Sequence, residues 1–299
     1  VWFDDVQWGA SSLAFLSELF ENEQLHFPAL FIATVRDDLL SERVREAEQL
    51  EHFAKQDGVS TLEVEPLDAS EHRDLVHKLL GFDDALAQRI VERTLGNPLF
   101  AVQLVGDWIE RGLLKPSGGG FKLVDDARIE LPDDLHTLWR QRIGRLLAQR
   151  FGGDSVMLAR QSLELAATLG LEVDQREWET ACMLAGVIPP HGLVELLLQQ
   201  RLARDTREGW ALVHGMLRES IERVARDAGR ARQHHLVCMD MLRTLYGEHA
   251  MGHAERVAQH AIAAGELEAA LDPLIDASYH EQVSGRYIAA EETLLRYEM

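Results

Sequence analysis

Val1-Trp2-Phe3-Asp4-Asp5, which opens the 299-residue sequence, is the stretch that decides the fold. Three apolar residues in a row are typical of a parallel strand that is covered on both faces. The two acids would then lie at the carboxyl edge of a sheet, where open α/β sheets bind their ligands. The bare pattern fits a strand that runs into an acidic turn better than a metal site, so its meaning depends on residues further along the chain.

The first third of the chain continues to alternate between helix and strand. We predict a helix over residues 11–20, where apolar residues recur at helical spacing, and another over residues 41–54. Residues 29–35 read as a second buried strand, and residues 61–64 as a third, shorter one. Because strands that alternate with helices form parallel sheets, we expect this part to belong to an α/β domain.

The sequence then becomes helical. Asp68 with Glu71 three residues later is a capping-box arrangement, so a helix is expected to begin there and to end at Gly81. Asp83 begins a second helix, which ends at Gly96. The next predicted elements are a helix at 99–114, a turn or linker at 116–120 and a short strand at 121–124.

Nearly everything beyond residue 131 is predicted to be helical. A short β-like run at residues 210–213 lies just before His214, and several helices with a small hairpin are typical of a winged-helix domain. The candidate helices span residues 134–149, 155–169, 175–184, 191–201, 215–226 and 230–245.

The last part of the sequence contains a weak internal repeat. Gly265 is followed by Ala270, and Gly285 by Ala290, at the same spacing. Small residues at such positions let stacked helices approach closely, which indicates a helical repeat. Two units by themselves do not establish a solenoid.

Composition excludes several classes of function. The formal net charge of -20 argues against sequence-independent binding of nucleic acid, which needs a cationic face. The two cysteines are too few for a disulfide framework. No stretch approaches the roughly 20 apolar residues of a membrane helix, and no signal peptide is visible. We therefore expect a cytoplasmic protein. The chain begins without methionine and ends inside an amphipathic pattern, which suggests a fragment.

The acids acquire a chemical meaning from two later positions. Mg²⁺ is held in proteins by one or two carboxylates and nucleotide phosphates, so Asp4 would be the metal-side acid and Asp5 would polarise a water molecule. Arg36, just past the second strand, could sense a γ-phosphate, because its charge never titrates. Pro98, at a helix boundary, could pack against a base.

Three motifs occur in the order of a known family. Asp4-Asp5-Val6-Gln7-Trp8, Thr34-Val35-Arg36-Asp37 and Gly96-Asn97-Pro98-Leu99-Phe100 together resemble the STAND class of P-loop ATPases. These signal-transduction ATPases with numerous domains include the maltose regulator and large regulators with LuxR-type DNA-binding tails. The resemblance covers nearly the whole chain, continuing through residues 131–135, 213–219 and the Gly265 and Gly285 units, which look like tetratricopeptide repeats.

The resemblance implies roles for the matching positions. Asp4 and Asp5 match the Walker B acids, and Arg36 matches the sensor arginine on the next strand. Asn97 and Pro98 belong to the lid motif, whose proline contacts adenine.

His214 looks like the winged-helix histidine that touches the β-phosphate of bound ADP and locks the resting state. From the residues alone, a buried core histidine beside Trp210 is an equally good interpretation.

We therefore expect a mainly α fold with the remnant of a parallel α/β P-loop sheet. The expected domains are the C-terminal part of a P-loop NTPase domain (1–65), a helical lid (66–115), a winged-helix domain (116–228) and truncated helical, tetratricopeptide-like repeats (229–299).

One departure from the family is decisive for activity. No Gly-x4-Gly-Lys-Ser/Thr loop, which cradles the phosphates, occurs in the sequence. ATP or ADP with Mg²⁺ is thus expected to bind the intact parent and not to bind this piece tightly, and the piece should not hydrolyse ATP alone. The sequence of residues 97–114 and 131–143 looks most like the corresponding part of large bacterial serine/threonine protein kinases. The parent protein could therefore be both an ATPase and a kinase.

Two apparent motifs are better read as structural. His72-Arg73-Asp74-Leu75 spells the start of a kinase catalytic loop, but it lies in a predicted helix, the expected asparagine is Leu79, and no Asp-Phe-Gly follows. The pairs His234 with Cys238 and His249 with His253 have helical spacing, yet neither has the two further ligands that structural zinc needs.

Three hypotheses remain open. The first is an ADP/ATP-controlled regulatory switch, in which the repeats sense an inducer or a protein partner and could also self-associate. The second is a helical protein-interaction module without a nucleotide role. The third is DNA binding by the winged helix, as in a LuxR-type regulator, which the negative charge disfavours. No membrane interaction is expected.

Overall fold

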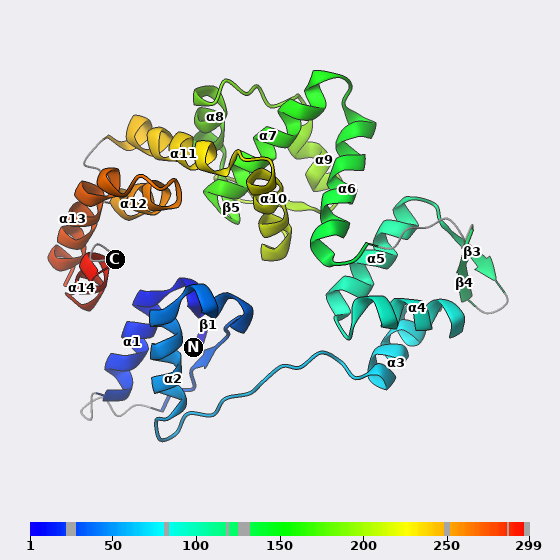
Figure 1. Ribbon diagram of the computed structural model, residues 1–299, viewed down its shortest axis with the longest axis horizontal. Coiled ribbons are helices and arrows are strands. Elements are labelled where there is room, and N and C mark those ends of the chain that lie inside the picture. Colours follow the sequence, from blue (N-terminus) through cyan, green and yellow to red (C-terminus); the bar gives the residue numbers. More distant parts are fainter. Residues whose placement is uncertain are drawn as a thin grey trace. The chain divides into compact units, whose positions relative to one another are not determined.

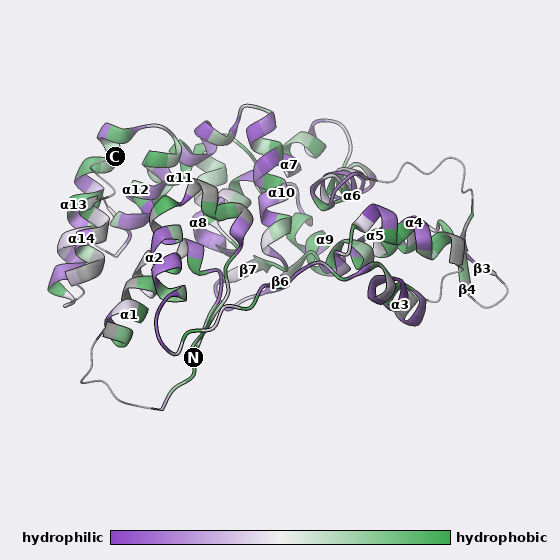
Figure 2. Ribbon diagram, turned by 60° about the horizontal axis from the view of Figure 1, so that its bottom comes forward, coloured by the Kyte–Doolittle hydropathy of each residue, from purple (hydrophilic) through white to green (hydrophobic). Residues whose placement is uncertain are grey.

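The computed structural model describes residues 1–21, 28–80, 84–117, 120–124, 132–247, 252–285 and 287–295. The chain divides into two compact units, one made of residues 1–63 with 242–299 and the other of residues 64–241 (Figure 1). Most described residues are helical and the sheets are small, as the predicted mainly α fold requires. Along the helices of both units, hydrophilic and hydrophobic residues alternate, which is the pattern of amphipathic helices (Figure 2).

The first unit begins with a two-stranded parallel sheet. Strand β1 (Trp2–Phe3) pairs with β2 (Ile32–Ala33), in the register Phe3↔Ala33. The helical elements beside it are η1 (Val6–Trp8), α1 (Ala10–Glu21), η2 (Asp37–Glu42) and α2 (Val44–Ala54). Their shared core contains Val6, Leu13, Leu16 and Phe53.

Three expectations about this sheet are wrong. The buried strand expected at 29–35 is only the two-residue β2, and both of its residues are exposed because helices cover a single face. The opening strand is not covered on both faces: Trp2 is 69% exposed, whereas Phe3 turns toward Phe15 and Phe31. Successive strand residues point to opposite faces, so helices on a single face bury only every second residue. Residues 61–64 form no strand, because they have no ladder partner among the described residues.

The end of the chain completes the first unit. Helices α12 (Ala254–Ala263), α13 (Leu267–Val283) and α14 (Tyr287–Leu295) pack in sequence, and α14 also contacts α1. Gly265 and Gly285 both have positive φ where one helix ends, and Ala270 and Ala290 are both buried in the helix that follows. The repeated glycine–alanine spacing therefore marks two equivalent helix–turn–helix corners.

The second unit begins with three short helices and a hairpin. These are α3 (Ala69–Leu80), α4 (Asp84–Thr94), α5 (Pro98–Glu110), and the antiparallel strands β3 (Leu114–Ser117) and β4 (Gly120–Leu123). The strand expected at 121–124 is present one residue earlier. The helix expected to reach residue 114 ends at Glu110, because Gly112 takes a positive φ.

Strand β3 replaces part of the expected linker at 116–120. Pro116 is tolerated there since both strands of a two-stranded hairpin are edge strands. The helix end expected at Gly81 and the cap expected at Asp83 lie outside the described residues.

The rest of the second unit is a helical assembly around a small sheet. Strands β5 (Glu172–Asp174), β7 (Gly209–Leu212) and β6 (Ala203–Asp205) are antiparallel in that order. Trp178 and Trp210 meet edge to face in the core, with ring centroids 5.6 Å apart. The helices are α6 (Leu135–Arg150), α7 (Asp154–Leu169), α8 (Gln175–Leu184), α9 (Leu193–Gln199), α10 (Gly215–Asp227) and α11 (Ala231–Tyr246).

Candidate functional site

The carboxyl ends of β1 and β2 carry a connected set of polar side chains. Parallel pairing of Phe3 with Ala33 brings the residues that come after them side by side. The hydroxyl of Thr34 donates to Asp4 Oδ1 over 2.5 Å, and the oxygen of that hydroxyl accepts the backbone N–H of Asp5 over 3.0 Å. The Thr34 hydroxyl therefore binds the carboxylate of Asp4 and the backbone N–H of Asp5.

A buried glutamine joins the two strand ends. Asp5 adopts a left-handed conformation (φ 53°, ψ 49°), which aspartate tolerates better than most residues, and this turns the chain from β1 into η1. Gln7 is fully buried; its Nε2 donates to Asp5 Oδ1 over 3.1 Å, and its Oε1 accepts the backbone N–H of Arg36 over 3.2 Å. Both hydrogen-bonding ends of this side chain are thus engaged at the sheet edge.

The structure places Asp4, Asp5 and Arg36 at one sheet edge. Both acids are exposed, and Arg36 is half-buried. Sequence reasoning gave no role to Thr34 or Gln7, which position this group, although both stand in the motifs around Asp4 and Arg36. A signal for them was present in the sequence, because each is a polar residue next to apolar ones. Thr34 follows the apolar strand that ends at Ala33, and Gln7 lies between Val6 and Trp8.

The turn at Gly96 is tightly packed. Gly96 has φ +78°, and a Cβ there would lie 2.4 Å from the carbonyl oxygen of Leu67. Asn97 caps α5 by accepting the backbone N–H of Phe100 over 3.0 Å, and Pro98 is the first residue of that helix. A structural role thus already accounts for both Asn97 and Pro98, and their contact with a nucleotide stays a prediction.

His72 supports the same turn from α3. Its Nδ1 accepts the backbone N–H of Gly96 over 3.1 Å, and its Nε2 lies 3.3 Å from the hydroxyl of Thr94, which donates to the carbonyl of Ile90. Burial lowers the pKa of His72. The apparent kinase motif is therefore a helical segment whose histidine stabilises the Gly96 turn.

His214 begins α10 directly after β7. Its carbonyl oxygen accepts the backbone N–H groups of Leu217 and Arg218, and its side chain is half-buried. His214 is therefore not a fully buried core residue. Trp210, four residues earlier, is one, because only 1% of it is exposed. Asp4, Asp5 and Arg36 belong to the first unit, and the Gly96 turn and His214 to the second.

The histidine pairs have other partners in the structure. His234 lies 3.0 Å from Glu164, and His253 stacks on Tyr246 at a centroid distance of 3.7 Å. His249 lies outside the described residues. Within the described ranges, no three His, Cys, Asp or Glu side chains gather as metal ligands.

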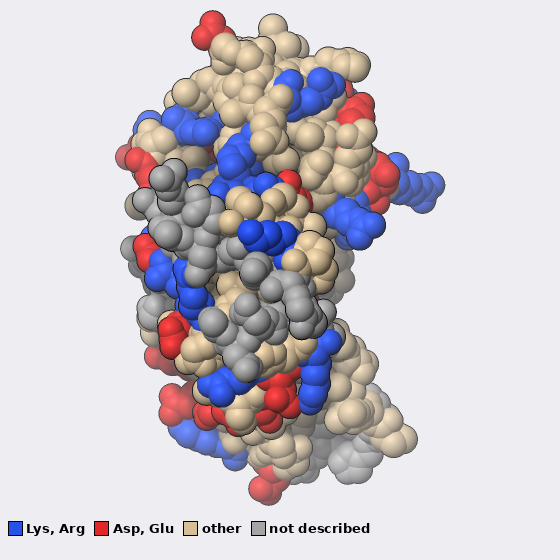
Figure 3. Space-filling view, turned by 90° about the vertical axis from the view of Figure 1, so that its right-hand side faces the viewer, with Lys and Arg blue, Asp and Glu red and all other residues tan. Residues whose placement is uncertain are grey.

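On the face shown in Figure 3, Lys and Arg are interspersed with Asp and Glu. None of the described helices combines the length and the apolar character that crossing a membrane requires.

Comparison with known proteins gives one distant likeness. No family model matches the sequence, and no curated protein matches it. A solved structure with a similar arrangement is a signal transduction ATPase with numerous domains (STAND) protein with a tetratricopeptide repeat sensor from Pyrococcus horikoshii. The TM-score is 0.45 at 13% identity, over 100% of this chain and 43% of that protein, so this chain spans less than half its length. A likeness of this degree does not define function.

Proposed function

We propose that this chain is the regulatory part of a bacterial signal-transduction ATPase that is switched by the exchange of ADP for ATP. The observation that carries the proposal is the hydrogen-bonded group at the β1–β2 edge. Thr34 and Gln7 fix two exposed carboxylates, those of Asp4 and Asp5, beside the strand that continues into Arg36. Paired acids next to an arginine at the carboxyl edge of a parallel sheet suit a magnesium nucleotide.

The donor set fits Mg²⁺ but not a complete nucleotide site. One oxygen of Asp4 accepts from Thr34, which leaves its other oxygen as a hard ligand for the metal. Bound Mg²⁺ would supply charge neutralisation to the phosphates. The sequence has no phosphate-cradling loop, and so this chain alone is not expected to hydrolyse ATP.

The switch itself would use the Gly96 turn and His214. In the parent, ADP would hold the sheet edge, the lid at Asn97 and Pro98 and the winged helix at His214 together, and ATP would release them. A nucleotide shifts such a balance only through its different affinity for the two states. The repeats α12–α14 would sense an inducer or a partner protein, and the parent would be a multidomain serine/threonine protein kinase.

The test is nucleotide binding to the intact parent protein. Titration with a fluorescent ADP analogue and Mg²⁺ is expected to give saturable binding that Asp4→Asn weakens at least about tenfold, the equivalent of roughly 1.4 kcal/mol. Asp57→Asn, at an exposed acid of the same unit, is the matched control. A parent that binds no nucleotide, or in which the two variants behave alike, would contradict the proposal.

A helical interaction module is the second candidate, and one observation favours it. Ile275, Tyr279 and Val283 succeed one another at one-turn spacing on α13 and are 52%, 55% and 70% exposed. Exposed apolar rows of this kind mark interaction surfaces. If Ile275→Asp abolished signalling by a parent that binds no nucleotide, this second function would replace the first.

A further inference from the structure

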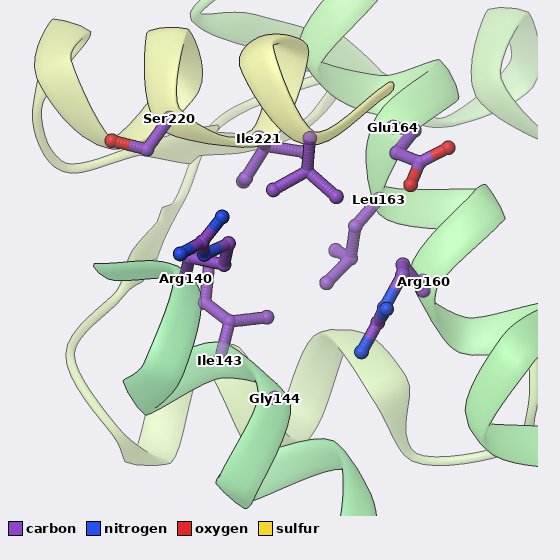
Figure 4. Close-up of a pocket in the computed structure, with 9 residues that line it drawn as sticks. Arg140, Ile143, Gly144, Arg160, Leu163, Glu164, Ser220 and Ile221 are labelled. Carbon is purple, nitrogen blue, oxygen red and sulfur yellow. The ribbon is translucent and has the colours of Figure 1, made fainter. Parts of the chain in front are cut away.

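A small cleft in the second unit lies between α6, α7 and α10, and none of the residues assigned to the nucleotide lines it. Ile143, Leu163, Ile221 and Val224 form its apolar lining, and Gly144 leaves one side of it open (Figure 4). The cleft encloses about 30 Å³. A single water needs about 10–15 Å³ and a benzene-binding cavity measures about 150 Å³, so this cleft admits the branched end of one aliphatic side chain and not a nucleotide base.

Two arginines flank the cleft. Arg140 comes from α6 and Arg160 from α7, and both line the rim of the cleft, with the guanidinium of Arg160 beside Gly144 (Figure 4). In the part of the chain that the structure describes, neither guanidinium has a carboxylate or hydrogen-bond partner. In a chain with a net charge of -20, two such arginines beside an apolar cleft are a local inversion of charge.

The other polar groups of the cleft are already satisfied internally. Glu164 is fully buried and accepts two hydrogen bonds from Arg230, at 2.8 and 2.7 Å. Ser220 donates to the carbonyl of Met216 over 2.6 Å and lies 2.8 Å from His136 Nδ1. The groups that remain available to bind a ligand are therefore the guanidinium groups of Arg140 and Arg160 and the aliphatic lining.

We propose that this cleft binds an acidic segment of a partner protein, with one leucine or valine in the cleft and flanking carboxylates on Arg140 and Arg160. Charge complementarity selects the acidic flanks, since each guanidinium can bind a carboxylate bidentately. The aliphatic lining selects the central side chain, which a phosphate backbone could not supply. This site is independent of the proposed nucleotide switch, because it shares no residue with it.

The experiment uses the 299-residue chain and a labelled probe peptide, acetyl-Glu-Glu-Leu-Glu-Glu-amide, followed by fluorescence anisotropy. The expected result is saturable binding that falls by about tenfold or more in Arg140→Glu and in Arg160→Glu. Arg176→Glu, at an exposed arginine of α8, is the matched control and should bind as the wild type does.

A second variant separates binding from folding. A Cβ on Gly144 would meet only the guanidinium of Arg160, at 3.9 Å, so the backbone accepts a side chain there, and the leucine of Gly144→Leu is expected to occupy the cleft. Replacing a helical glycine also favours the helix, so the Tm should hold or rise while peptide binding is lost.

Three outcomes would overturn the proposal. The first is equal affinity for a peptide with glutamine in place of leucine. The second is a DNA duplex that binds the chain through Arg140 and Arg160 and displaces the peptide. The third is a Gly144→Leu variant that binds the peptide as tightly as the wild type does.

Discussion

At the scale of single residues, His72 shows how a buried side chain can hold a turn. Because Nδ1 accepts from Gly96 N–H, the neutral ring must carry its proton on Nε2, facing Thr94. A protonated ring would place a second N–H against the Gly96 donor. The pKa of His72 is lowered by burial, so the folded state binds fewer protons than the unfolded state when the pH approaches the ordinary histidine value.

The predicted consequence is a pH-dependent stability. The contribution of His72 should be complete above its unfolded pKa of about 6.5 and should decline as the pH falls from there toward the lowered folded pKa. His72→Asn keeps an acceptor near the Nδ1 position but does not titrate. Urea denaturation at pH 7.5 and 5.5 should therefore show a smaller loss of stability on acidification in His72→Asn than in the wild type, and equal losses would contradict this role.

Gly96 gives a second prediction at this scale. Gly96→Ala would impose a positive φ on alanine and bring its Cβ to 2.4 Å from the Leu67 carbonyl, so we expect a loss of about 1–3 kcal/mol in unfolding free energy. Gly106→Ala, inside α5 with nothing within 4 Å, should be neutral or stabilising by up to about 1 kcal/mol. Chemical denaturation of the two variants makes the comparison, and a neutral Gly96→Ala would contradict it.

At the scale of elements, a buried ion pair joins α7 to α11. Glu164 is fully buried and binds Arg230 with both oxygens, while His234 lies 3.0 Å away. Glu164→Gln removes the charge that compensates Arg230, so we expect a loss of about 3–5 kcal/mol in unfolding free energy.

The exposed pair of Glu172 with Arg204 provides the control for that prediction. Both side chains are more than half exposed, and Glu172→Gln should cost less than about 1 kcal/mol. Thermal unfolding followed by circular dichroism would compare the two variants. Similar effects of both would show that burial does not decide the strength of these pairs.

Sequence predicted the long elements well and the short ones poorly. Asp134 accepts the Thr137 N–H at the start of α6, and residues 175–184 form α8 as expected, because caps and helical spacing are local signals. Strands β5 and β6 have three residues each, too few for a period, and were missed. The short strand β7 was detectable because residues 210–213 are a run of four apolar residues just before His214.

The candidate site was predictable only in part. Asp4, Asp5 and Arg36 come directly after apolar strands, so the sequence pattern predicts their position at a sheet edge. The roles of Thr34 and Gln7 depend on the register between two strands that lie about thirty residues apart, which no local pattern reveals.

At the scale of the molecule, the two compact units divide the proposed switch residues. Helix α1, near the start of the chain, packs against α14, near its end. The sequence does not predict this contact, because nothing in the sequence of either helix specifies the helix against which it packs. If the proposed switch is correct, ligand binding must couple groups that belong to separate units. Each such group should then affect nucleotide affinity beyond any effect that it has on the stability of its own unit.

His214 is the residue on which this coupling is best tested. His214→Ala in the intact parent is expected to weaken ADP binding about 5- to 150-fold, the range of a coupling free energy of about 1–3 kcal/mol, and to raise basal signalling. The half-buried side chain makes no cap hydrogen bond to α10, so the substitution should leave the Tm nearly unchanged. His191→Ala, at an exposed histidine of the same unit, is the control. Unchanged ADP affinity together with unchanged basal signalling would remove His214 from the switch, whereas a lowered Tm with unchanged affinity would assign it to the structure of the second unit alone.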